Sequence, residues 1–145
     1  MTHDNYYDVT QWHIGNPNKD IGEVINSIIL DIKKRQAATD INNGGKPGAI
    51  IYIPPGDYHL KTQVLIDISY LKIMGAGHGF VSSSIRFNTP ADDWANLHDI
   101  WPGGSRILVD ICAHPRDEEH AGAAFYVKRS GAPRISSVAF ENFCI

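Results

Sequence analysis

Residues 49–58, AIIYIPPGDY, are the stretch that points most directly to the fold. The apolar run Ala49 to Ile53 has the length of a buried strand, and a Pro-Pro-Gly turn followed closely by an aromatic residue ends it. Upstream of this stretch the apolar residues recur every three or four positions, whereas downstream they occur in short runs broken by Gly, Pro and Asn. We therefore expect one helix followed by many short strands.

The helix is expected to begin at Asp20. Asp20 and Glu23 have capping-box spacing, and the basic turn Lys33-Lys34-Arg35 suits the negative end of a helix dipole. The apolar residues between these ends share one face, and they are Ile21, Val24, Ile25, Ile28, Ile29 and Ile32. Residues 1–19, which precede this helix, are polar and punctuated by Gly, Asn and Pro, and are expected to form an extended arm.

Seven short strands are expected after the helix, at 49–53, 64–66, 71–73, 85–87, 107–111, 125–128 and 137–140. Their spacing suits a sandwich, a barrel or a parallel β-helix, and does not choose among them. Two features favour the all-β parallel β-helix. An amphipathic helix before the first strand is what the open end of a solenoid needs, and the tail Ile135 to Ile145 repeats apolar residues through a bend, as a stacked rung does.

The predicted organisation has three parts: an arm at 1–19, a capping helix and turn at 20–43, and the first coils of the solenoid at 44–145. A solenoid needs a terminal cap with a polar outer face, yet the apolar pattern runs to Ile145. We therefore expect a truncated N-terminal portion of a longer repeat stack.

Composition narrows the classes of partner. With 13 Lys+Arg against 16 Asp+Glu the net charge is −3, which gives no electrostatic reason to bind nucleic acid or an anionic membrane. No run approaches the roughly 18 to 20 apolar residues that span a bilayer, and the first residues lack a signal-peptide pattern. Neither nucleic acid nor membrane is expected as a partner.

Several motifs together resemble the inulin fructotransferase family, which includes the related difructose anhydride hydrolases. The segment 44–58 is similar to the first strand of pectin-lyase-like right-handed β-helix proteins. The family resemblance runs from Tyr7 to about Ile107 and is carried by Tyr7-Asp8-Val9-Thr10, Trp12, residues 22–26, 44–60, 62–71 and 75–80, Ser84-Ile85-Arg86 and residues 103–107.

The resemblance implies a homotrimer of right-handed parallel β-helices with fructan sites near the protomer interfaces. It also implies a lyase that cleaves the terminal difructosyl unit of inulin, using a hydroxyl of the neighbouring fructose in place of water, so that a cyclic difructose anhydride is released. The alternative within the family is a hydrolase that opens the anhydride with water. The protein is expected to be secreted, with its leader absent from this chain, or cytoplasmic if it is the hydrolase. The family's catalytic Asp and Glu lie on later coils and have no match in residues 1–145, so the catalytic residues are not assigned. That absence favours a third hypothesis, a non-catalytic carbohydrate-binding or trimerising β-helix module.

Five residues are candidates for substrate binding. His78 stands between glycines and either faces a sugar or forms a turn, and the guanidinium groups of Arg86 and Arg106 suit sugar hydroxyls or ion pairs between protomers. Trp94 and Trp101 lie in a long insertion, 88–104, where their indole faces either stack on sugar rings or pack on the solenoid.

Other motifs are assigned structural roles. Gly75-Ala76-Gly77-His78-Gly79 lacks the Lys-Ser/Thr of a phosphate loop, so a tight corner is expected there. Adjacent side chains such as Asp92 and Asp93 diverge in a loop and do not form a facing acid/base pair. The cluster from His114 to His120 lacks metal-site spacing and is interpreted as a solvated loop. No metal or other cofactor is expected.

Overall fold

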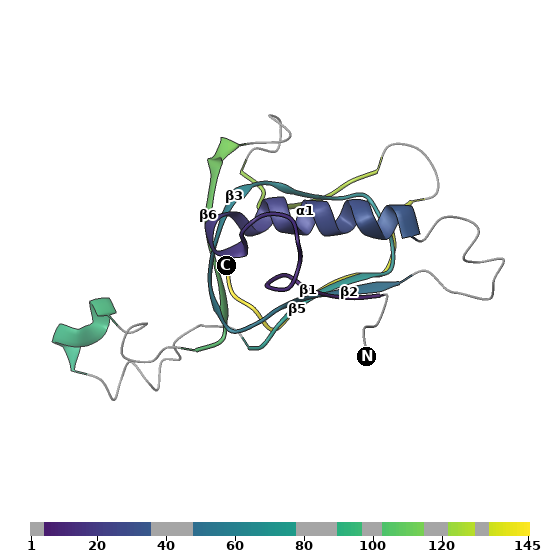
Figure 1. Cartoon of the computed structure of the whole chain (residues 1–145). Coiled ribbons are helices and arrows are strands. Elements are labelled where there is room, and N and C mark those ends of the chain that lie inside the picture. Colours follow the sequence, from purple (N-terminus) through teal and green to yellow (C-terminus); the bar gives the residue numbers. More distant parts are fainter. Residues whose placement is uncertain (1–4, 36–47, 78–89, 97–102, 115–121, 130–133) are drawn as a thin grey trace.

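The computed structural model describes residues 5–35, 48–77, 90–96, 103–114, 122–129 and 134–145 (Figure 1). The described part is mostly strands with one α-helix. Its elements are β1 (Tyr6–Asp8), α1 (Pro17–Arg35), β2 (Ala49–Ile53), β3 (Gly56–Thr62), β4 (Val64–Ile66), β5 (Leu71–Gly75), the 3-10 helix η1 (Ala91–Asn96), β6 (Ser105–His114), β7 (Phe125–Val127) and β8 (Val138–Glu141).

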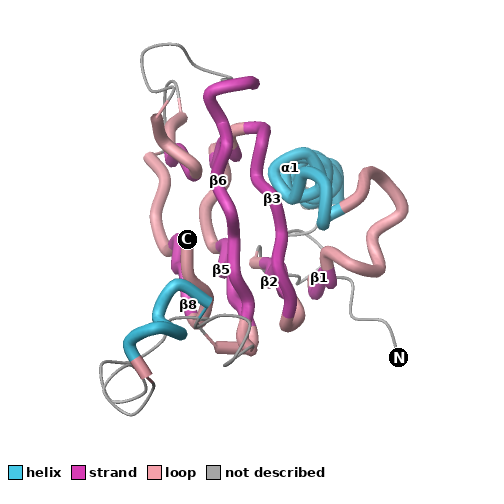
Figure 2. The backbone as a smooth tube through the Cα atoms, turned by 90° about the vertical axis from the view of Figure 1, so that its left-hand side faces the viewer, coloured by secondary structure: helices cyan, strands magenta, loops and turns pink. Residues whose placement is uncertain are grey.

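All described strand pairs are parallel, and they form three sheets. Sheet A has the order β1-β2-β5-β8, sheet B pairs β3 with β6, and sheet C pairs β4 with β7. The chain visits the three sheets in the same order twice, first through β2, β3 and β4 and then through β5, β6 and β7, before β8 begins a third pass. Figure 2 shows these passes side by side, with α1 and β1 at one end and β8 at the other.

Residues at equivalent positions of successive passes pair with one another. Ile51 pairs with Ile73, and Ile73 pairs with Phe140, so that one column of apolar side chains runs through sheet A. Tyr58 and Ile107 form the equivalent column in sheet B. Inward residues alternate with outward ones along β2 and β5, because successive side chains of a strand point to opposite faces. The core therefore lies inside the coil that the passes form.

The helix α1 lies across one end of this coil (Figure 1), and its apolar face is buried as the spacing predicts. It begins at Pro17, three residues before the expected start, because Asn16 accepts hydrogen bonds from the backbone amides of Asn18 and Lys19 at 3.0 and 3.4 Å. Asp20 has an extended backbone (φ −156°) and begins the main segment by accepting a hydrogen bond from Gly22 N at 3.1 Å. The helix ends at Arg35, as expected.

The helix also satisfies the strand edges that it covers. The side chain of Asn26, which is buried in α1, donates from Nδ2 to Gln63 O at 3.0 Å and accepts from Leu65 N at 3.1 Å. A buried backbone group without a partner is costly, so this asparagine replaces the bonds that a neighbouring strand would supply. The arm is fastened to the same helix, because Trp12 Nε1 donates to Ser27 Oγ at 3.0 Å and Tyr7 Oη donates to Asp31 Oδ2 at 2.9 Å.

β2 and β4 have the bounds that the sequence predicts, 49–53 and 64–66. β5, β6, β7 and β8 are found where strands are expected, but one or both ends of each differ by one to three residues from the expected bounds. The expected strand 85–87 lies outside the described residues. Two strands were not predicted. β1 lies in the arm and pairs along β2, and β3 follows directly after the Pro-Pro-Gly turn.

Candidate functional site

The corner between sheets A and B brings together residues from all three passes. Here the backbone of Gly77, which leaves sheet A, meets Gly104 and Ser105, which enter sheet B. Ser105 N donates to Gly77 O at 2.7 Å, and Gly56 N donates to Gly104 O at 2.9 Å. Gly77 and Gly104 have φ values of +108° and +71°, which favour glycine. Gly77 and Gly104, which flank the segment 78–102 in the sequence, therefore lie at one corner.

Ser105 fixes the corner from inside. Its side chain is fully buried, and its Oγ donates to Ile53 O at 2.7 Å and accepts from Ala76 N at 2.9 Å. Its carbonyl accepts from Cys144 N at 3.0 Å, on the third pass. One serine thus links the backbone of three successive passes, and the strand beginning at Ser105 has a fixed position.

Arg106, one residue further on, points to the outer face of sheet B and meets Asp57. The parallel register places Asp57 directly beside Arg106. Nε of Arg106 donates to Oδ1 at 2.8 Å, and Nη2 donates to Oδ2 at 2.6 Å, which is a two-pronged arrangement. The side chain of Arg106 is 24% exposed and that of Asp57 is 56% exposed, so the pair faces solvent from a rigid sheet.

The backbone of Asp57 is tied to the helix end. Asn18, in the first turn of α1, donates from Nδ2 to Asp57 O at 3.1 Å. The pair is therefore supported by the helix on one side and by the Ser105 corner on the other. A guanidinium group is planar and its N–H donors suit hydroxyl and carboxylate oxygens. Because Asp57 fixes the orientation of this plane, the outer face is able to present donors in a fixed direction to a polar ligand.

Of the five predicted binding residues, the structure places one side chain, that of Arg106. Trp94 lies in η1, whose backbone projects away from the coil in Figure 1, but its side chain lies outside what the structure describes. His78, Arg86 and Trp101 also lie outside the described residues. Asp57 and Ser105 were not predicted. The sequence does contain a signal for the outward position of Asp57, because apolar and polar residues alternate from Asp57 to Lys61, with Tyr58 and Leu60 facing inward.

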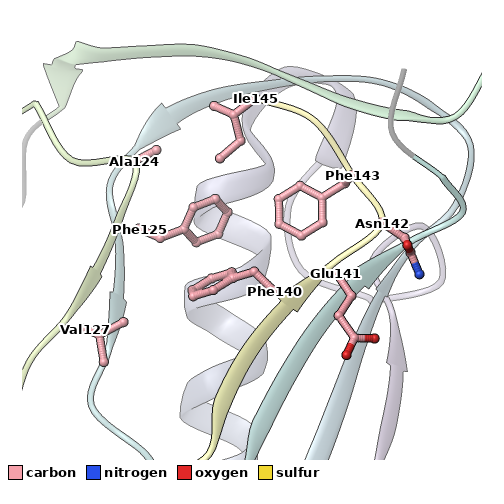
Figure 3. Close-up of a pocket in the computed structure, with 8 residues that line it drawn as sticks. All are labelled: Ala124, Phe125, Val127, Phe140, Glu141, Asn142, Phe143 and Ile145. Atoms are coloured by element: carbon pink, nitrogen blue, oxygen red, sulfur yellow. The ribbon is translucent and has the colours of Figure 1, made fainter. Parts of the chain in front are cut away.

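A cleft of about 470 Å³ opens at the end of the coil opposite α1 (Figure 3). Three aromatic rings from the second and third passes form its floor: Phe125 lies 5.3 Å from Phe140 and 6.1 Å from Phe143 between ring centroids. Phe125 and Phe140 extend the inner columns of sheets C and A. The complete lining is Ala124, Phe125, Val127, Phe140, Glu141, Asn142, Phe143 and Ile145. The cleft therefore belongs to the apolar interior of the coil, and offers a sugar few polar partners.

The outer face of sheet A carries a different surface. The rings of Tyr6 and Tyr52 are stacked with centroids 6.0 Å apart, and Tyr6 is 43% exposed. Partial burial, together with the neighbouring Tyr52 and Asp8, raises the pKa of Tyr6 above its usual value of 10.0, so its hydroxyl stays protonated at neutral pH. Lys72 and Glu141 form an exposed ion pair at 3.4 Å further along the same sheet. This face therefore combines aromatic area with three charged side chains, those of Asp8, Lys72 and Glu141.

Within the described residues, no group of three or more His, Cys, Asp or Glu side chains is placed to hold a metal ion. No helix in the described part of the chain is long and apolar enough to cross a membrane. Asp92 and Asp93 lie exposed in the first turn of η1. His114 ends β6, and residues 117–120 of the same cluster fall outside the described ranges.

Known proteins resemble the chain over nearly its whole length. It is 43% identical over 145 residues to the inulin fructotransferase (DFA-I-forming) of Arthrobacter globiformis, with 96% of this chain and 34% of that protein covered. No family model matches it.

Solved structures give a closer similarity. The crystal structure of DFA-IIIase from Arthrobacter chlorophenolicus A6 is 68% identical, with a TM-score of 0.77 over 97% of this chain and 32% of that one. The same enzyme in complex with GF2 is 67% identical, with a TM-score of 0.76 over 98% of this chain and 32% of that chain. The chain thus spans about a third of the length of these relatives.

Proposed function

The chain belongs to the inulin fructotransferase family, and from this premise we propose that it forms part of an enzyme that opens a cyclic difructose anhydride with water. The observation that carries the proposal is the identity of 68% to DFA-IIIase, compared with 43% to the DFA-I-forming fructotransferase. Of the two reactions expected from the sequence, this difference in identity favours the hydrolase.

The second candidate is the fructotransferase reaction, in which inulin is converted to a cyclic difructose anhydride. It is favoured by the match to the Arthrobacter globiformis protein, whose name states that reaction. Both reactions break a glycosidic bond through a transition state with oxocarbenium character, and both need an acid for the leaving oxygen. They differ in whether water or a sugar hydroxyl captures the anomeric carbon, so the same scaffold is able to support either.

We assign this chain a scaffolding and substrate-binding role within the enzyme. The fold proposed is a right-handed parallel β-helix, in keeping with the strong preference of parallel crossovers for that hand. The three parallel sheets, their repeated order and the capping position of α1 support it. The bound sugar is proposed to contact Arg106, together with His78, Arg86, Trp94 and Trp101 from the segment that leaves the same corner.

The assembly proposed is a homotrimer. The outer face of sheet A supports it, because Tyr6, Tyr52 and Met74 present aromatic and apolar area there, with the charged side chains of Asp8, Lys72 and Glu141 around them, as a polar rim surrounds the centre of a protein interface. The hydrolase is proposed to act in the cytoplasm on an imported disaccharide, whereas a fructotransferase would act on polymeric inulin outside the cell.

Product analysis tests the proposal. The longest product of the gene is incubated separately with difructose anhydride III and with inulin, and the products are separated by chromatography. Linear inulobiose from the anhydride, with inulin unchanged, is expected. A cyclic disaccharide from inulin would establish the second candidate. A folded protein that binds these sugars but converts neither would support the non-catalytic binding module and refute both reactions.

A further inference from the structure

The ion pair of Asp57 and Arg106 has features that stability alone does not explain. An ion pair exposed to solvent contributes about 0 to 1 kcal/mol in general, because water screens it. In this pair both nitrogen–oxygen hydrogen bonds are formed, at 2.8 and 2.6 Å. The backbone beside each of the two residues is also held by hydrogen bonds. The main consequence of such a geometry is orientation, since it sets the plane of the guanidinium group.

Hydrogen bonds next to Arg106 and Asp57 fix the positions of both residues. Arg106 follows Ser105, whose side chain is fully buried and hydrogen-bonded to the first and second passes. Asp57 follows Gly56, whose amide is bonded to Gly104 O, and its own carbonyl accepts from Asn18. The two strands are paired in parallel at this position. The carboxylate therefore acts on the guanidinium from a fixed place.

The pair also controls charge. A lone arginine on an open sheet face would attract anions, including phosphorylated sugars, because guanidinium binds phosphate in a two-pronged manner. With Asp57 directly bonded to it, the positive charge of the guanidinium group is balanced by a neighbouring carboxylate, while the polar N–H groups of the arginine keep a defined direction. Such a surface suits a neutral polyhydroxy ligand better than an anionic one.

We infer that Asp57 is a positioning residue, which holds the Arg106 guanidinium for the hydroxyl groups of an uncharged fructose oligomer and disfavours phosphorylated sugars. This inference rests on the proposed function, because it takes the ligand at Arg106 to be a fructan or difructose anhydride. It adds a residue that the sequence did not single out and a selection rule for the ligand.

Binding of two probes to the longest product of the gene tests the inference. Inulotriose is the neutral probe and fructose 1,6-bisphosphate is the anionic probe, each titrated calorimetrically at low ionic strength. In Asp57→Asn the affinity for inulotriose is expected to fall by roughly tenfold, about the value of one well-aligned charge-assisted hydrogen bond. Binding of the bisphosphate is expected to appear, and to be lost again in Asp57→Asn/Arg106→Gln. A purely structural role for Asp57 would not produce a gain of anion binding.

Asp67→Asn is the matched control, because it also removes one carboxylate from an exposed ion pair, that with Lys33 at 2.7 Å, and changes the net charge equally. It is expected to leave both affinities unchanged. The inference is overturned if Asp57→Asn, with an unfolding midpoint like that of the wild type, keeps its affinity for inulotriose, or if Asp67→Asn gains the same anion binding. Wild-type protein that binds no inulotriose would instead refute the proposed role of this corner in fructan binding, and the inference with it.

Discussion

Replacing Asp20 is expected to loosen the capping helix from the coil. Its carboxylate accepts four described hydrogen bonds: one from Gly22 N inside the helix, and three from the strand β3. The bonds from β3 come from Lys61 N at 3.0 Å, Thr62 N at 3.1 Å and Thr62 Oγ1 at 2.6 Å. These donors lie where the register between β3 and β6 shifts, so the strand itself does not supply partners for all of them. One side chain therefore starts the main segment of the helix and fastens it to the first pass.

The magnitude follows from these bonds. Loss of a helix N-cap costs about 1 kcal/mol. Each donor left without its charged acceptor costs roughly 1 to 3 kcal/mol if water cannot replace it, and the low end applies here because Asp20 and Thr62 are only half-buried. For Asp20→Ala we therefore expect the free energy of unfolding to fall by about 3 to 4 kcal/mol. For Asp20→Asn, which keeps one acceptor oxygen, about 1 to 2 kcal/mol is expected.

Urea unfolding of both variants beside the wild type measures these differences. Glu141→Ala is the control, because it removes a carboxylate whose ion pair with Lys72 is about 40 to 45% exposed on both sides, and it is expected to cost no more than about 1 kcal/mol. If Asp20→Ala proves no more destabilising than Glu141→Ala, the helix does not depend on this carboxylate and the reasoning is refuted.

The pH dependence of the difference in unfolding free energy between the wild type and Asp20→Asn gives a second check. Burial of Asp20 disfavours its charged form, but the hydrogen bonds from Thr62 and Lys61, together with the nearby backbone amide of Glu23, outweigh that effect and lower its pKa below the usual 3.8. A carboxyl with a lowered pKa contributes stability that is present above 3.8 and is lost as the pH falls through the lowered pKa. The gap between wild type and Asp20→Asn is therefore expected to be constant near neutral pH and to shrink below about pH 4. A gap that widens with acid would contradict the assignment.

Three further substitutions test the packing of the coil, each by denaturant unfolding. Gly75→Ala would push a Cβ into the backbone oxygen of Asn142 and is expected to cost about 1 to 3 kcal/mol. Gly122→Ala, whose Cβ meets no atom of the described residues within 4 Å, should stay within about 0.5 kcal/mol, and equal effects would contradict this. Ser105→Ala removes the hydroxyl that links the first two passes, and a loss of about 1 to 3 kcal/mol is expected, so a neutral result would refute its linking role. Phe140→Ala is expected to cost less than the roughly 3 to 5 kcal/mol of a fully buried phenylalanine, because its side chain is 43% exposed in the cleft; a full-sized loss would mean that the ring is covered.

The elements that the sequence predicted well are those whose signal is local. The helix shows six apolar positions at one spacing with a cap at Asp20, and the run Ala49 to Ile53 is bounded by turn residues on both sides. Both signals depend on neighbouring residues alone. β3 was missed because the Pro-Pro-Gly turn in front of it and the charged residues Asp57 and Lys61 suggest a loop, although Tyr58 and Leu60 alternate with them and are buried.

Of the residues at the candidate corner, Arg106 was predicted from the sequence to bind the substrate, and its contact with a sugar stays a prediction. Arg106 was singled out because a cation beside an apolar run must face outward or find a partner, and it does both. Its partner Asp57 comes from the preceding pass, and the pairing depends on where the chain re-enters sheet B after the segment 78–102. The passes differ in length, so the register between them is not encoded in any spacing along the chain. The convergence of Gly77, Gly104 and Ser105 on one corner has the same origin.

The repeated strand order also has a consequence for how quickly the chain folds. Among the described strands, each one after β1 pairs with a partner from an adjacent pass, and β2 and β5 are the pair that a short stretch of chain separates. Closing long stretches is entropically unfavourable and slows folding, whereas α1 needs neighbouring residues alone. We expect a nucleus of α1, β2, β3 and β5 to form early, with β6 and β7 joining in the slow step. Shortening residues 78–102 should then accelerate folding while leaving the unfolding rate almost unchanged.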